Sequence, residues 1–431
     1  MEVNGRIRPT GDLNLAHVAI IGAGITGVTS AYALLKRGHA VTLIDRHRYP
    51  AMETSFANGG QLSASNAEVW NSWATMLKGL KWMMRRDAPL LLSLRPSYHK
   101  YSWLAEFCGQ IRNYEANTID TVRLALAARD HLFAMAQAEA IDFDLERRGI
   151  LHIYHDRAAF ETAEKANRLL VQGGLERHAV SPAEMRAIEP TIHGAFHGGF
   201  YTPGDATGDI HKFTRGLAEA CARRGASVHL DTSVERITPH DAGVGITLAR
   251  TGDGAARTET IAADAVLVCA GIASRRFAAM LGDRINIYPV KGYSITVRLD
   301  DLRSQDAAPT VSLLDERAKI VTSRLGRTRF RVAGTAEFRG ENRDIRADRI
   351  APLVRWSEQL FPDMSTEQVV PWAGLRPMTP SMLPRVGRGR HPRVFYNTGH
   401  GHLGWTMSAA TADIAAETID RSLRMPTALA S

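Results

Sequence analysis

The fold of this chain is decided by residues 17–45, HVAIIGAGITGVTSAYALLKRGHAVTLID. The apolar, β-branched run at 18–21 predicts a strand that is buried on both faces. Gly22, Gly24 and Gly27 follow it in the G-x-G-x-x-G spacing. In such a turn the first glycine permits the tight bend, the second lets the backbone approach a diphosphate, and the third lets a helix pack on the strand. Backbone N–H groups and the helix dipole then hold the diphosphate.

The residues after the glycines complete the unit. A helix is predicted at 28–37 and ends at Gly38, and a second strand at 40–44 finishes at Asp45. An acidic side chain at this point accepts hydrogen bonds from an adenosine ribose. A lone glycine motif would suit any glycine-rich turn, but the complete order of strand, glycines, helix, strand and acid favours a dinucleotide site. The motif does not separate FAD from NAD, whereas the charge of Asp45 argues against NADP.

Composition and charge are those of an ordinary globular protein. The chain has 431 residues, enough for two domains, of which 45% are hydrophobic and 23% are charged. The net charge is +8, but Lys and Arg are scattered along the chain, so nucleic acid is not an expected partner. A basic surface suits acidic substrates or an anionic membrane face equally well.

Cysteine usage predicts a reducing compartment. Cys108, Cys221 and Cys269 form no C-x-x-C pair and no His/Cys cluster at metal-ligand spacing, so we expect three buried thiols and no metal site. The first fifteen residues are polar, and no apolar run approaches the ~18 residues that span a bilayer. We therefore expect a cytoplasmic protein.

Three further segments are candidates to face the cofactor. Thr54, Ser55 and the turn-forming run 58–61 either pass along the cofactor or form a plain surface loop. Residues 264–271, DAVLVCAG, are typical of another parallel strand that delivers its carboxyl end to a ligand. Residues 394–419 have the pattern of strand, glycine-rich loop and helix, which predicts a second helix N-terminus at the cofactor.

Residues 70–103 are rich in Trp and Met. The helical spacing of their apolar side chains favours packing against the chain's own core. The alternative is an amphipathic surface that touches a membrane, with Lys78, Lys81, Arg85 and Arg86 at anionic head groups.

Four motifs point to a family. They are TSFANGGQLSAS (54–65), YPVKGYS (288–294), GLRPMTP (374–380) and NTGHGHLGWTMS (397–408). The glycine-rich unit resembles the FAD-binding fingerprint of the D-amino-acid oxidase-like flavoproteins. Together with the four motifs, in this order and over nearly the whole chain, it resembles the bacterial D-amino-acid dehydrogenases of the small-subunit type. Ser381-Met382 depart from the Asp-Gly pair that is usual in these relatives, which leaves the exact substrate open.

The resemblance, together with the alternating pattern at 286–338, predicts an α/β protein that is α+β overall. A Rossmann-like FAD-binding domain with a parallel sheet would be joined to a second, substrate domain built on a mainly antiparallel sheet with helices. The predicted boundaries are 16–75, 206–282 and 372–425 for the FAD-binding domain, and 76–205 and 283–371 for the substrate-binding domain.

The resemblance implies non-covalent FAD. Gly22, Ala23 and Gly24 would hold the diphosphate, and Asp45 would bind the ribose. Val234 would meet the adenine through its backbone.

At the other end of the cofactor, residues 58–62 would run beside the reactive edge of the flavin ring. Residues 401–406 would place the N-terminus of the last helix at the N1–C2=O edge, where the helix dipole stabilises the charge of reduced flavin. The complete predicted set of cofactor-binding residues is Gly22, Ala23, Gly24, Ile25, Thr26, Gly27, Asp45, Arg46, Thr54, Ser55, Asn58, Gly59, Gly60, Gln61, Leu62, Val234, Ala270, Gly271, Gly401, His402, Leu403, Gly404, Trp405 and Thr406.

The resemblance places the carboxylate of the substrate on Arg376, whose guanidinium fork grips two oxygens. A surface ion pair is the alternative for this arginine, but its setting in GLRPMTP favours the site. Tyr288 and Tyr293 would bind the carboxylate or the amine, or pack in the sheet. His400 and His402 are candidate bases, with a structural role as the alternative. The predicted catalytic residues are Arg376, Tyr288, Tyr293 and His400.

The implied reaction is the oxidation of a D-amino acid, in which Cα passes a hydride to flavin N5 and the imino acid hydrolyses to a 2-oxo acid and ammonia. The electrons would pass to a quinone-type acceptor, with peripheral contact at the inner face of the cell membrane. Three alternatives stay open. They are a dehydrogenase or oxidase of D-hydroxyproline or another secondary amine such as sarcosine, or of glycine; a 2-hydroxy-acid dehydrogenase; and a non-catalytic flavin-binding subunit. The presence of both Arg376 and Gly401 argues against the last of these.

Overall fold

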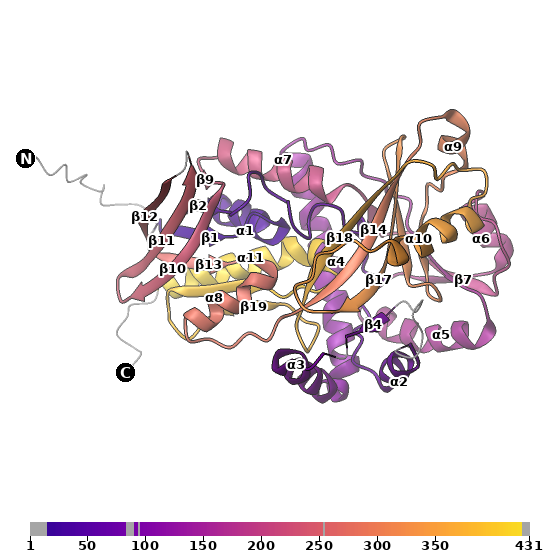
Figure 1. Ribbon diagram of the computed structural model, residues 1–431, viewed down its shortest axis with the longest axis horizontal. Coiled ribbons are helices and arrows are strands. Elements are labelled where there is room, and N and C mark those ends of the chain that lie inside the picture. The colour runs from indigo at the N-terminus through magenta and orange to yellow at the C-terminus, as the bar shows by residue number, and fades with distance from the viewer. Residues whose placement is uncertain (1–14, 83–89, 94, 253–254, 425–431) are drawn as a thin grey trace, which may run out of the picture.

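The computed structural model describes residues 15–82, 90–93, 95–252 and 255–424. Figure 1 shows a parallel sheet with its helices beside a larger mixed sheet. An antiparallel sheet of strands β10, β11 and β12 lies at the outer end of the parallel one.

The parallel sheet has the strand order β19-β20-β13-β1-β2-β9. Its strands are β1 (His17–Ile21), β2 (Ala40–Ile44), β9 (Ser227–His229), β13 (Ala265–Val268), β19 (Arg385–Arg388) and β20 (Val394–Thr398). Neighbouring strands run parallel except for the edge pair β19–β20. Because both faces of this sheet are covered, the central strand is an almost continuous apolar run.

The two faces of the parallel sheet are covered differently. Val18 and Ile20 pack with helices α1 (Ile25–Lys36), α7 (Ile210–Arg223) and α11 (Gly404–Arg424). Ala19 and Ile21 face the opposite core. That core is made by β10 (Thr232–His240), β11 (Gly243–Gly252), β12 (Ala255–Ala263) and α8 (Ser274–Met280).

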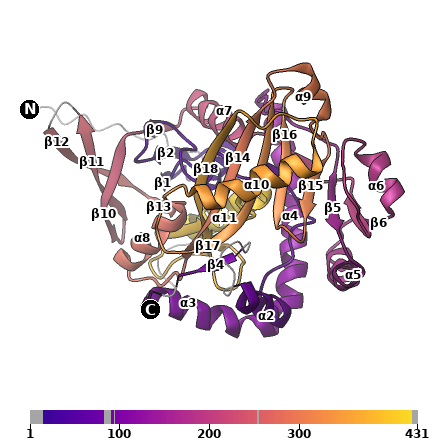
Figure 2. The same cartoon turned by 45° about the vertical axis from the view of Figure 1, so that its right-hand side comes forward.

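The mixed sheet has the order β18-β14-β17-β16-β15-β5-β7-β6, and β4 also pairs with β17. Its strands are β4 (Leu90–Leu92), β5 (Ile150–Tyr154), β6 (His178–Val180), β7 (Gly198–Thr202), β14 (Tyr288–Arg298), β15 (Ser312–Asp315), β16 (Ile320–Leu325), β17 (Arg329–Phe338) and β18 (Val369–Met378). The β15–β5 and β17–β4 pairs are parallel and the others are antiparallel. Helix α10 (Ala347–Leu360) lies across this sheet and buries Leu353 and Trp356 (Figure 2).

The remaining elements connect these layers. They are β3 (Gln61–Leu62), which pairs with β8 (Ala206–Thr207), the helices α2 (Trp73–Trp82), α3 (Tyr98–Gly109), α4 (Tyr114–Ala138), α5 (Arg157–Gln172), α6 (Pro182–Ile188) and α9 (Leu302–Ala307), and two 3₁₀ turns at Ile111–Asn113 and Gly271–Ala273.

The predicted fold class is confirmed: a parallel α/β sheet stands beside a mainly antiparallel one. The predicted boundary between residues 371 and 372 falls inside β18, which pairs with β14. We therefore propose to move that boundary to the end of β18, because a strand belongs with the sheet that holds its hydrogen bonds. Cys221 and Cys269 are buried as predicted, but Cys108 is exposed.

Candidate functional site

A cavity of about 740 Å³ connects the parallel sheet with the mixed sheet. At one end it is lined by the carboxyl ends of β1 and β2 and by the start of β10, and at the other by β14, β17 and β18. The loop after β3 and the N-terminus of α11 line the region between them. Ligands of open α/β sheets bind at the carboxyl ends of the strands, so this cavity is the expected site.

The glycine-rich turn forms one end of the cavity. Gly22 has a φ of +107°, and a Cβ there would lie 2.6 Å from the carbonyl oxygen of Cys269. A Cβ on Gly27 would lie 1.8 Å from the carbonyl oxygen of Gly22, so α1 packs against the turn only because this residue is glycine. Gly24 precedes the first residue of α1 and lines the cavity, where its backbone is open to a diphosphate.

Asp45 stabilises the same turn. One carboxylate oxygen accepts a hydrogen bond from the backbone N–H of Ala23 at 2.6 Å, and the other accepts one from His47 at 2.9 Å. Asp45 also lines the cavity, beside the glycine-rich turn. The acid therefore orders the turn as well as offering acceptors to a ligand.

Most of the predicted cofactor-binding residues meet at this cavity. Those that line it are Gly22, Gly24, Ile25, Thr26, Asp45, Arg46, Thr54, Ser55, Asn58, Gly59, Gly60, Gln61, Val234, Ala270, Gly271, Gly401, His402, Leu403, Gly404, Trp405 and Thr406. Ala23, Gly27 and Leu62 do not line it: the first and third are buried, and Gly27 packs on the turn.

Helix α11 begins at Gly404, so its unpaired backbone N–H groups face the cavity beside residues 401–406. Trp405 is almost fully buried, and its indole N–H has no hydrogen-bond partner among the described residues. An orphan donor that lines a cavity fits a bound group rich in acceptors, such as a dinucleotide.

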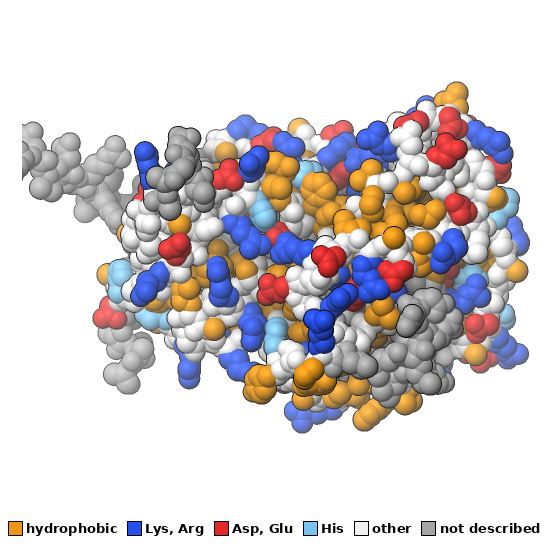
Figure 3. All heavy atoms as spheres, in the orientation of Figure 1, with side chains coloured by type: hydrophobic (Ala, Val, Ile, Leu, Met, Phe, Trp, Pro, Cys, Tyr) orange, Lys and Arg blue, Asp and Glu red, His pale blue; other side chains and the backbone are white. Residues whose placement is uncertain are grey.

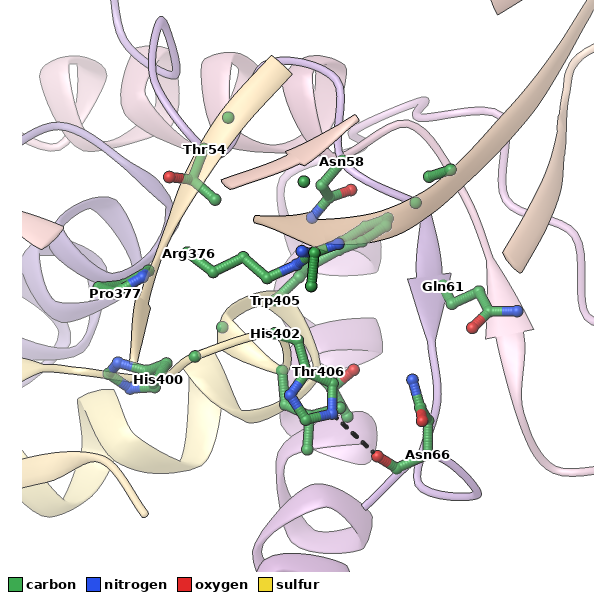
Figure 4. A pocket seen from close by; sticks show the side chains of 18 of the residues that line it. Thr54, Asn58, Gln61, Asn66, Arg376, Pro377, His400, His402, Trp405 and Thr406 are labelled. Atoms are coloured by element: carbon green, nitrogen blue, oxygen red, sulfur yellow. Dashed lines mark hydrogen bonds between the residues drawn. The ribbon is translucent and has the colours of Figure 1, made fainter. Parts of the chain in front are cut away.

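Arg376 extends from β18 into the cavity between Asn58 and His402 (Figure 4). Its Nη1 donates a hydrogen bond to the carbonyl oxygen of Thr335 at 3.1 Å. Burial lowers the pKa of Arg376 to about 10, which still leaves the guanidinium charged at neutral pH. In the part of the chain that the structure describes, no carboxylate forms an ion pair with it. A buried cation without a counter-ion is an anion-binding group.

The two predicted tyrosines occupy different positions. Tyr293 lines the cavity, but its hydroxyl donates to Glu337 at 2.8 Å. Tyr288 does not line the cavity, and its hydroxyl accepts a hydrogen bond from the N–H of Gly340 at 3.1 Å. The ring of Tyr288 stacks on Phe338 instead. The predicted contact between Tyr288 and substrate does not fit this position, because register on β14 carries its side chain into a separate core.

His400 lines the cavity and is buried. Its Nε2 lies 2.9 Å from the hydroxyl oxygen of Thr411, and that hydroxyl donates to the carbonyl of Ser408, so His400 acts as the donor. Burial lowers the pKa of His400 to about 3. It is therefore a neutral, hydrogen-bonded histidine, which favours the structural role over that of a base.

His402 stacks on Trp70, with ring centroids 4.9 Å apart and an interplanar angle of 20°. Its Nε2 donates to the carbonyl oxygen of Asn66 at 3.2 Å, drawn as the dashed line in Figure 4. Burial is the main cause that lowers the pKa of His402 to about 4, and the charges of Arg376 and Lys319 act in the same direction. His402 is neutral and lies near both cations.

A charged part of the cavity was missed by the sequence analysis. Glu68 accepts a hydrogen bond from the hydroxyl of Tyr114 at 2.6 Å, and burial raises the pKa of Glu68. Lys319 forms an ion pair with Glu316, which also lies 3.6 Å from His152. These residues come from separate elements and share no sequence motif, so only the fold brings them together. The only signal in this region was the aromatic run that contains Trp70.

Comparisons with known proteins agree with this geometry. A family model described as FAD dependent oxidoreductase matches residues 17–418. The chain is 60% identical over 414 residues to D-amino acid dehydrogenase 3 of Mesorhizobium japonicum, which covers 96% of this chain and 99% of that protein. It is 40% identical over 408 residues to D-amino acid dehydrogenase of Dechloromonas aromatica, covering 93% and 96%. The solved glycine oxidase from Geobacillus kaustophilus shares the fold, with a TM-score of 0.73 at 22% identity over 94% of this chain and 95% of that one.

Proposed function

Because this chain belongs to the family of FAD dependent oxidoreductases, we propose that it oxidises D-amino acids to 2-oxo acids and ammonia. The observation that carries the proposal is Arg376, a buried cation in the cavity whose guanidinium lacks a carboxylate partner among the described residues. A small substrate that carries a carboxylate supplies that partner. The relatives that match nearly the whole chain are named D-amino acid dehydrogenases, which supports an amino acid as the substrate.

FAD is held without a covalent bond in this proposal. The glycine-rich turn and Asp45 would hold the diphosphate and the ribose, the backbone at Val234 would contact the adenine, and the N-terminus of α11 would stabilise the flavin ring. When bound, FAD supplies the chemistry by accepting a hydride from the Cα of the substrate. The buried donor of Trp405 gains an acceptor in the filled site.

The residues of this chain orient the substrate rather than move protons. Arg376 fixes the carboxylate and thereby the direction of the Cα–H bond. His400 and His402 are neutral, and their Nε2 atoms are engaged with Thr411 and Asn66. Imidazoles with pKa values of about 3 and 4 are too weakly basic to take a proton from an ammonium group, so the substrate enters with its amine already neutral in this proposal.

For the electrons, we propose a quinone-type acceptor reached at a membrane surface. Helices α2 and α3 expose Trp73 (70%), Leu77 (59%), Tyr98 (88%) and Tyr101 (50%), and Figure 3 shows hydrophobic side chains on the surface over these helices. Ser72, Ala74 and Thr75 also line the cavity, so the exposed face adjoins the site. None of the helices in the described ranges is long and apolar enough to cross a bilayer, and contact at the interface is the mode that this surface favours.

Four basic residues of this segment, Lys78, Lys81, Arg85 and Arg86, are also predicted to contact anionic head groups. The side chains of Lys78 and Lys81, and all of Arg85 and Arg86, lie outside the described residues. Exposure of Trp73 and Leu77 is the observation that supports membrane contact over packing in the core, because neither side chain is buried. Trp103, from the same run, is fully buried and packs on Phe107.

The decisive experiment is an anaerobic screen of flavin bleaching. Purified protein is mixed with D- and L-amino acids, D-hydroxyproline, sarcosine, glycine and 2-hydroxy acids, and ammonia release is measured in parallel. Bleaching by primary D-amino acids with release of ammonia supports the proposal. Bleaching only by secondary amines would assign the chain to oxidation of D-hydroxyproline or its analogues, and bleaching only by 2-hydroxy acids would contradict amine oxidation.

A further inference from the structure

Three adjacent strands of the mixed sheet build the surroundings of Arg376. Arg376 lies on β18, Gly292 lies on the neighbouring strand β14, and Thr335 lies on β17 beyond it. The guanidinium passes over Gly292 and donates to the carbonyl oxygen of Thr335 at 3.1 Å. The arginine is thus held at both ends, by its own strand and by a strand two positions away.

The backbone of Thr335 is irregular. The register of β14 and β17 shifts between Lys291 and Tyr293, so that Gly292 faces both Thr335 and Ala336. This is a β-bulge, a feature that re-aims side chains and is common beside active sites. Thr335 has a φ of +62°, a left-handed conformation that is strained for a β-branched residue.

Glycine would occupy this position without strain. The side chain of Thr335 is therefore retained at a cost in stability, as strained residues at functional sites are. Only 8% of the residue is exposed, and Thr335 is one of the residues that line the cavity. Its hydroxyl oxygen has no hydrogen-bond partner within the described ranges of the chain. A buried, unpaired hydroxyl costs free energy unless a ligand completes it.

We propose that Thr335 is a substrate-binding residue whose hydroxyl donates a hydrogen bond to the carboxylate held by Arg376. One residue then serves both sides of the contact: its carbonyl positions the guanidinium, and its hydroxyl binds an oxygen of the same anion. This inference rests on the proposed function for the identity of the substrate. It requires only that an organic carboxylate enters the cavity.

The test compares three variants of the FAD-loaded protein. Thr335→Val keeps the shape and removes the hydroxyl, Thr335→Ser keeps the hydroxyl, and Thr335→Gly removes both hydroxyl and strain. Binding of pyruvate, a non-reacting carboxylate, is titrated by the change in flavin absorbance. KM and kcat are measured with the D-amino acid that reduces the wild type fastest. Thr238→Val, at an exposed position on β10, is the control.

Loss of a hydrogen bond to a charged group predicts that Thr335→Val and Thr335→Gly raise KM and the Kd for pyruvate about tenfold. Thr335→Ser should stay within about threefold of wild type, and Thr335→Gly should also raise the melting temperature, which shows that it folds. Pyruvate binding unchanged in both Val and Gly variants would overturn the proposal, as would equal losses in Ser and Val. If no D-amino acid reduces the wild type, the proposed function fails, while the pyruvate titration still decides the role of Thr335.

Discussion

Arg376 and Gly292 lie so close together that a Cβ on Gly292 would be 2.4 Å from the guanidinium. Real Cβ contacts are essentially never below 3.0 Å, so the arginine reaches its position only because Gly292 has no side chain. The backbone of Gly292 does not need glycine for its own conformation, since it does not have a positive φ. The glycine is required by the side chain that passes over it.

Gly292→Ala should therefore displace the guanidinium and lower kcat/KM at least about tenfold, mainly through KM. FAD content should not change, because Gly292 lies on the mixed sheet, away from the glycine-rich turn. Gly245→Ala on β11 is the matched control, since its nearest neighbours would be 3.8 Å from the added Cβ. Equal kinetics of wild type and Gly292→Ala would contradict the crossing of Arg376 over β14.

Arg376→Ala should weaken capture of a carboxylate substrate by ~3 kcal/mol or more, because a partly desolvated anion loses its partner. Arg376→Lys should recover only part, since the planar fork that grips two oxygens is gone. The readouts are kcat/KM and bound FAD, with Arg157→Ala on the exposed face of α5 as control. A near-wild-type efficiency in Arg376→Ala would refute the assignment.

Gly24→Val should yield a largely cofactor-free protein. A Cβ at Gly24 would meet only the hydroxyl of Ser55, at 3.5 Å, so the fold tolerates it, while the added methyl groups occupy the space for the diphosphate. FAD released by denaturation is measured by absorbance, and folding is checked by circular dichroism. Full FAD content in a folded variant would exclude the turn as the diphosphate site.

Three buried imidazoles should make the folded protein less stable in mild acid. Burial lowers the pKa of His400 to about 3 and the pKa values of His402 and His152 to about 4, whereas an unfolded histidine titrates near ~6.5. Between these values the unfolded chain binds protons that the folded chain does not, so the free energy of unfolding falls as pH decreases from about 7 to about 4. Each histidine contributes a slope of up to ~1.4 kcal/mol per pH unit.

The measurement is the melting temperature from pH 4 to pH 7 for wild type and His400→Gln. The variant should show a flatter dependence, because one of these protons is no longer taken up on unfolding. Carboxylates with a lowered pKa, such as Glu316, add to the same trend in both proteins, so the difference between the curves is the test. Parallel curves would mean that His400 is not kept neutral by the fold.

Trp73→Ser combined with Leu77→Ser should reduce binding to anionic lipid vesicles. Tryptophan settles at the lipid interface, and electrostatic attraction of the basic chain weakens with salt, so wild-type binding should fall between low and high ionic strength. Co-sedimentation is the readout, and Tyr49→Ser, at an exposed aromatic position outside α2 and α3, is the control. Absence of wild-type sedimentation, together with stoichiometric hydrogen peroxide from turnover, would identify a soluble oxidase instead.

The sequence was sufficient where the determinants are local. The G-x-G-x-x-G turn, the helix that follows it and the strand that ends at Asp45 all follow from residues within a few positions of one another. The strand predicted at 40–44 is observed with the same bounds, Ala40–Ile44. Such features depend on backbone conformation, apolar periodicity and capping, which neighbouring residues fix by themselves.

The tertiary structure decided which predicted residues reach the cavity. Tyr288 and Tyr293 are five residues apart on β14, so strand alternation places them on opposite faces, and the packing of the layers decided that only the side of Tyr293 borders the cavity. Thr335 carried no signal in the sequence, since its left-handed conformation arises from the bulge between β14 and β17. The register of a strand is set by its pairing with strands that are distant in the sequence. A charge or hydroxyl becomes buried without a partner only when the layers of the fold pack together. The sequence by itself therefore determined the cofactor-binding fold, and the assembled sheets determined how a substrate is held.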